Sequence, residues 1–91
     1  MSAIRKEKRN PERLRVVLSP RAKPLLTESA STENVSPHGM RVLTEQFWKR
    51  GTELTVQSSK HELLGRGRVV YCQSFSHGTF AIGLELLART D

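Results

Sequence analysis

The chain has 91 residues, of which 36% are hydrophobic and 26% charged, and its formal net charge is +6. This length fits one small domain, whose thin core leaves little room for a deep catalytic cavity. No apolar run approaches the roughly 20 residues that a membrane span needs, so membrane insertion is not expected. The single cysteine, Cys72, excludes an intrachain disulfide and a thiolate zinc site, and it favours a cytoplasmic location.

The positive charge is concentrated in the N-terminal quarter of the chain. Residues 1–23 hold eight basic and two acidic side chains, whereas residues 24–91 hold seven of each and are neutral overall. A basic block of this kind is typical of a solvated arm that meets an anion, such as nucleic acid, a membrane surface or a phosphorylated small molecule. The competing interpretation is a tail that only aids solubility.

The first half of the chain predicts two strands. Residues 1–13 are almost devoid of apolar side chains and are expected to form a flexible arm. Residues 14–19 form a β-branched run that predicts a strand. Residues 22–28 are ambiguous because Pro24 would confine them to a sheet edge, and residues 29–39 are rich in turn-forming side chains. A second strand is expected over residues 40–44.

The second half of the chain predicts further short strands. We expect a connection over residues 45–51, a strand over 52–58, a loop or brief helical turn over 58–65 and a strand over 65–74. A hairpin loop at 74–78 then leads to the clearest alternation, with Phe80, Ile82, Leu84 and Leu86 on one face of a strand. Five or six strands at this spacing predict an all-β domain, either a small antiparallel barrel or a sandwich.

Two short motifs precede strands in this sequence. Arg9 and Arg13 form an RxxxR pattern at the junction of the arm and the first strand, and Arg5 with Arg9 forms a second instance. Asn34, Ser36 and Gly39 form an NxSxxG pattern about 20 residues later. Either motif alone arises easily by chance, but the two in this order are far more specific.

Together with the segments GRVVY and FAIGLELL, these motifs make the chain resemble the PilZ domain family of bacterial cyclic di-GMP receptors. The resemblance covers residues 8–87 and implies a stand-alone, six-stranded antiparallel β-barrel of the split-barrel type. It further implies a basic arm over residues 1–13, a barrel over residues 14–91, and little or no C-terminal helix, since the chain stops four residues after Leu87. It also implies a receptor that binds cyclic di-GMP, needs no other cofactor and passes the signal to an unidentified effector protein.

The resemblance assigns Arg9 and Arg13 to the ligand. An arginine fork can bind the O6 and N7 acceptors of guanine together, grip a phosphate or stack on a base, which lysine cannot reproduce. Lys8 stands where many members have another arginine and could add a phosphate contact. Tyr71 is a candidate stacking platform for a guanine, and its alternative role is ordinary barrel packing.

The second motif supplies polar groups that match a guanine. Asn34 offers a carbonyl acceptor for the N1 and N2 hydrogens, Ser36 offers a hydroxyl, and Gly39 permits a positive φ or close approach of the ligand. The alternative is a local turn in which Asn34 and Ser36 only cap their own backbone.

Other functions fit the sequence less well. The three histidines show no metal-ligand spacing, and no pair of acids suggests acid–base catalysis, so an enzyme is not expected. One alternative is a small basic β-barrel that binds RNA or DNA, but few aromatic side chains are available and they are not interleaved with basic residues. Another is a PilZ-like interaction module without nucleotide. Trp48 is predicted to pack in the core or at a barrel end.

Overall fold

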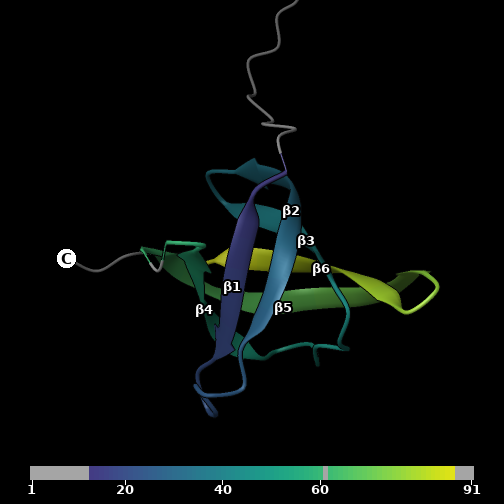
Figure 1. Ribbon diagram of the computed structural model, residues 1–91, viewed down its shortest axis with the longest axis horizontal. Helices are drawn as coiled ribbons and strands as arrows, with labels where there is room; N and C mark the ends of the chain where they lie inside the picture. Colours follow the sequence, from purple (N-terminus) through teal and green to yellow (C-terminus); the bar gives the residue numbers. More distant parts are fainter. Residues whose placement is uncertain (1–12, 61, 88–91) are drawn as a thin grey trace, which may run out of the picture.

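The computed structural model describes residues 13–60 and 62–87, which form six strands and no helix. All neighbouring strands are antiparallel and close into a barrel in the order β1-β2-β3-β6-β5-β4 (Figure 1). The strands are β1 (Arg15–Pro20), β2 (Glu28–Ser36), β3 (Gly39–Thr44), β4 (Glu53–Ser58), β5 (Leu63–Ser76) and β6 (Thr79–Leu86). The prediction of a six-stranded antiparallel barrel is therefore confirmed.

Alternating side chains of the strands fill the barrel. Apart from the buried threonines Thr32 and Thr44, the inward positions are apolar and almost inaccessible to solvent, because closure of the barrel buries them from every side. They comprise Val16, Leu18, Ala30, Val42, Leu54, Val56, Val69, Ile82 and Leu84. The strand predicted over residues 14–19 is confirmed as β1, and the alternation over residues 52–58 and 79–86 places Leu54, Val56, Ile82 and Leu84 correctly in the core.

Strand β2 corrects the prediction of a turn-rich segment over residues 29–39. Nine residues from Glu28 to Ser36 are extended, and only Pro37 and His38 form the turn before β3. Ala30 and Thr32 are 3% and 1% exposed and point into the barrel. Pairing with β1 on one side and β3 on the other stabilises this strand in spite of its polar, turn-forming composition.

Strand β5 is also longer than expected. It begins at Leu63, inside the segment predicted as a loop or helical turn, and only Ser59 and Lys60 lie in a described turn there. Its far end extends with β6 into a hairpin that projects from the barrel (Figure 1). Pairing with β4 explains the early start, because Leu63 lies opposite Gln57.

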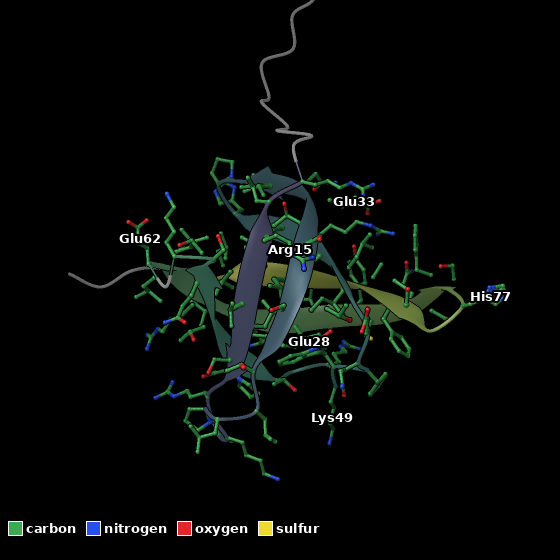
Figure 2. All side chains as sticks on the ribbon, viewed as in Figure 1. Arg15, Glu28, Glu33, Lys49, Glu62 and His77 are labelled. Atoms are coloured by element: carbon green, nitrogen blue, oxygen red, sulfur yellow. The ribbon has the colours of Figure 1, made fainter. Side chains whose placement is uncertain are left out.

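The barrel has two distinct ends. At one end β1 begins and β2 ends, so Arg15 and Glu33 lie toward it; at the other end β1 ends and β2 begins, near Glu28 and Lys49 (Figure 2). Within the described residues, no helix is long and apolar enough to cross a bilayer.

Candidate ligand-binding site

Arg13 lies just before β1 and beside the second motif. The backbone N–H of the next residue, Leu14, donates to Thr32 Oγ1 over 2.9 Å, and the Thr32 N–H donates to the Leu14 carbonyl over 2.9 Å. These bonds fix Arg13, which is exposed, next to the last residues of β2. Arg9 and Lys8 lie outside the described residues.

A β-bulge in β2 presents the first residue of the second motif to solvent. The register between β2 and β3 shifts between Thr32 and Asn34, so that Glu33 is the extra residue and Asn34 lies opposite Arg41. Asn34 is half-buried, and its side chain makes no hydrogen bond to another described residue. Its amide therefore keeps its donors and its acceptor for a ligand.

The turn between β2 and β3 has its own hydrogen bond. The hydroxyl of Ser36, which is exposed, donates to the carbonyl of Gly39 over 3.3 Å. This contact matches the alternative interpretation, in which the motif serine caps a local turn, and it is weak enough to be exchanged for a ligand contact.

Gly39 has a structural role that the sequence did not reveal. Among the described glycines only Gly51 and Gly78 have a positive φ, so the positive-φ role considered for Gly39 is wrong. A Cβ at Gly39 would lie 2.5 Å from the carbonyl oxygen of Leu84 in β6. The glycine therefore lets the backbones of β3 and β6 approach closely.

A row of four paired residues crosses the outer wall of the barrel from β2 to β5. Asn34 lies opposite Arg41, Arg41 opposite Gly83, and Gly83 opposite Tyr71. Neighbouring strands are about 4.8 Å apart, so the row offers a continuous surface across four strands. We call Asn34, Arg41, Gly83 and Tyr71 the outer row.

Hydrogen bonds hold Arg41 in one orientation on this wall. Its Nε donates to Glu33 Oε1 over 2.6 Å and its Nη1 donates to the Tyr71 hydroxyl over 2.9 Å. The guanidinium carbon is 5.9 Å from the centre of the Tyr71 ring, within the range of a cation–π contact. The bond to Glu33, followed by the bond to Tyr71, raises the pKa of Arg41, so this side chain stays charged.

The absence of a side chain at Gly83 allows this arrangement. A methyl group added there would overlap the Tyr71 ring, which lies directly on the glycine. Tyr71 remains 36% exposed, so the ring is available from solvent as the predicted platform requires.

The sequence interpretation did not include Glu33 or Arg41. A signal was present, because a strand over residues 40–44 puts Arg41 on the face opposite to Val42, two residues after Gly39. Its contact with Tyr71, 30 positions away in sequence, follows only from the pairing of both strands with β6.

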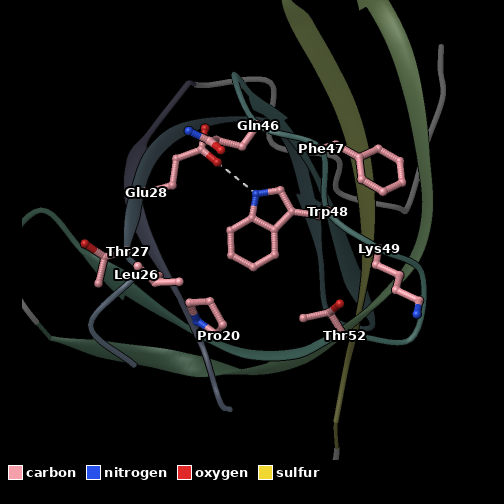
Figure 3. Close-up of a pocket in the computed structure, with 9 residues that line it drawn as sticks. All are labelled: Pro20, Leu26, Thr27, Glu28, Gln46, Phe47, Trp48, Lys49 and Thr52. Carbon is pink, nitrogen blue, oxygen red and sulfur yellow. Dashed lines mark hydrogen bonds between the residues drawn. The ribbon is translucent and has the colours of Figure 1, made fainter. Parts of the chain in front are cut away.

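The opposite end of the barrel holds a cavity of about 360 Å³ beside Trp48. Trp48 is 7% exposed, and its Nε1 donates to Glu28 Oε1 over 2.8 Å (Figure 3). The other oxygen of Glu28 accepts from the Glu45 backbone N–H over 2.6 Å. The prediction that Trp48 packs at a barrel end is confirmed. Because both oxygens of Glu28 are engaged, this carboxylate is held by the protein itself.

Metal ligation finds no support in the described part of the chain, where no three His, Cys, Asp or Glu side chains cluster. Its chemical groups are instead those of a binding module: an unpaired amide, a fixed guanidinium and an exposed ring on the wall of a small closed barrel. The chain belongs to the PilZ domain family, which it matches over residues 3–91. PilZ domains are known as receptors of cyclic di-GMP and are binding modules rather than enzymes. No curated protein matches the chain significantly.

Proposed function

We propose that this protein is a bacterial, cytoplasmic receptor that binds cyclic di-GMP at the outer row and signals to an effector protein. The observation that carries the proposal is the side-chain amide of Asn34, which has no hydrogen-bond partner among the described residues. It lies beside Arg41 and close to the start of β1, which Arg13 precedes. A guanine base offers both donors and acceptors to such groups, and the phosphodiesters offer negative charge to the basic arm.

In the proposed binding mode, both the N-terminal arm and the wall of the barrel contact the nucleotide. The guanidinium groups of Arg9 and Arg13 grip the nucleotide, Lys8 adds a phosphate contact, and Asn34 and Ser36 receive a base edge. Gly39 keeps this end of β3 close to β6, and Tyr71 stacks on a guanine. The ligand selects one arrangement of the arm against the barrel, and the changed surface is what an effector protein would recognise.

Calorimetric titration of the purified protein with cyclic di-GMP tests this function, with GTP and a short single-stranded RNA as controls. We expect saturable binding of cyclic di-GMP and none of the controls, and the stoichiometry distinguishes one nucleotide from a stacked pair. Absence of binding to cyclic di-GMP would overturn the proposal. Binding of the RNA would then favour a nucleic-acid-binding barrel. Absence of binding to cyclic di-GMP, GTP and the RNA would favour a protein-interaction module.

A further inference from the structure

Glu33 and Arg41 present a donor and an acceptor side by side on the wall of the barrel. Two of the five N–H groups of the Arg41 guanidinium are engaged, by Glu33 and Tyr71, which leaves three for a ligand. Glu33 uses Oε1 for Arg41, and no other described residue bonds to its Oε2. The side chains of Arg41 and Glu33 are 29% and 27% exposed, so a ligand can reach both.

The protein fixes the direction of these free groups before any ligand arrives. Arg41 is anchored through two of its nitrogens, and the β-bulge sets the position of Glu33. Preorganised groups lose little conformational freedom on binding, so each hydrogen bond contributes more to affinity than one from a mobile side chain.

The pair suits a base better than a phosphate. The carboxylate of Glu33 lies beside the guanidinium and offsets its positive charge, which weakens attraction for an anion. Hydrogen bonding remains, with N–H donors from Arg41 next to a carboxylate acceptor from Glu33. A neutral base edge with an acceptor beside a donor is complementary to this arrangement.

Guanine has such an edge, and adenine has the reverse. On the Watson–Crick edge of guanine the O6 acceptor is adjacent to the N1–H donor, whereas adenine places its N6–H₂ donor next to the N1 acceptor. We propose that the Glu33–Arg41 pair is a guanine-specificity element, in which Arg41 donates to O6 and Glu33 Oε2 accepts from N1–H. This inference rests on the proposed function, since it assigns the base choice of the same site.

Comparison of three cyclic dinucleotides tests the assignment. We would titrate cyclic di-GMP, cyclic GMP–AMP and cyclic di-AMP into the wild type, Glu33→Gln and Arg41→Met. The wild type is expected to bind them in that order of decreasing affinity. Glu33→Gln turns an amide donor toward the base, so the preference for cyclic di-GMP over cyclic di-AMP should fall about tenfold or more, within what one good base contact contributes. Arg41→Met should reduce the same ratio.

A second ion pair on another part of the barrel supplies the matched control. Glu53 accepts from Arg21 Nη1 over 3.1 Å, and Glu53→Gln should leave the order and ratio of the three affinities unchanged. Intrinsic fluorescence of Trp48, the single tryptophan, reports whether each variant is folded.

The affinity ratio distinguishes recognition from a structural role. If Glu33→Gln and Arg41→Met weaken all three dinucleotides in parallel, or keep the wild-type ratio, the specificity assignment is wrong while the receptor function stands. A folded wild type that binds none of the three would overturn the receptor function, and this inference with it.

Discussion

The outer row and the Trp48 end of the barrel use similar chemical groups in opposite ways. At the Trp48 end, both carboxylate oxygens of Glu28 accept hydrogen bonds from the protein, and the indole ring is almost fully buried. On the outer row, the side-chain amide of Asn34 has no hydrogen-bond partner among the described residues, and the Arg41 guanidinium keeps three N–H groups unused. Satisfied groups stabilise the fold, whereas polar groups with remaining capacity can bind a ligand.

The two regions also expose aromatic rings in different settings. Phe47 is 65% exposed beside the cavity, and its ring packs edge-on against Phe80 with centroids 6.0 Å apart. Tyr71 is exposed on the outer row and is held by contact with Gly83 and Arg41. The Tyr71 ring lies in one row with Asn34 and Arg41, and its hydroxyl accepts a hydrogen bond from the Arg41 guanidinium, which still has unused N–H groups; the proposed ligand is therefore placed there.

Replacement of Trp48 by alanine should have the largest effect on stability. Loss of a buried indole costs about 3–5 kcal/mol, and it also removes one of the two hydrogen-bond donors to Glu28. Urea unfolding followed by circular dichroism would measure the change, because the variant lacks the fluorescent side chain. A loss below about 1 kcal/mol would contradict the stabilising role of the Trp48 end.

Replacement of Arg13 by alanine should weaken cyclic di-GMP binding and leave stability unchanged. A charge-assisted contact contributes about 1.5–3 kcal/mol, or roughly 10- to 150-fold in Kd. Arg13→Lys should rescue little, because lysine lacks the planar fork. Calorimetry on both variants provides the check, and wild-type affinity in Arg13→Lys would refute the argument from fork geometry.

Replacement of Gly39 by alanine should destabilise the barrel by about 1–3 kcal/mol. The added methyl group meets the Leu84 carbonyl at 2.5 Å, so the backbones of β3 and β6 must separate. Gly65→Ala is the matched control, since a Cβ at Gly65 would meet only a side-chain carbon of Leu86, at 4.0 Å. Thermal unfolding of both variants tests the difference, and equal melting temperatures would remove the structural explanation for Gly39.

Replacement of Asn34 by alanine should have the smallest effect on stability, within about 0.5 kcal/mol, because no described residue depends on its amide. Thr32→Val, two positions away, removes the acceptor of the Leu14 N–H and should cost about 1 kcal/mol. Binding should show the reverse order, with Asn34→Ala losing more affinity than Thr32→Val. A variant of Asn34 that unfolds more easily than Thr32→Val would show that this amide serves the fold.

Much of this protein could be predicted from local sequence patterns. A β-branched run identified the strand around Val16, alternation identified those around Val56 and Ile82, and the two motifs together indicated the family and a barrel fold. These features are readable because side chains alternate along any strand, and a buried face must be apolar wherever the strand lies.

Tertiary structure alone decided three other features. Strand β2 exists because β1 and β3 pair with it on both sides, although its own residues favour turns. Gly39 is needed because the Leu84 carbonyl of β6 lies against it. Arg41 reaches Glu33 because β2 pairs with β3, and it reaches Tyr71 because β6 lies between β3 and β5. Each feature depends on which strands become neighbours, and barrel closure sets that through contacts between residues far apart in the chain.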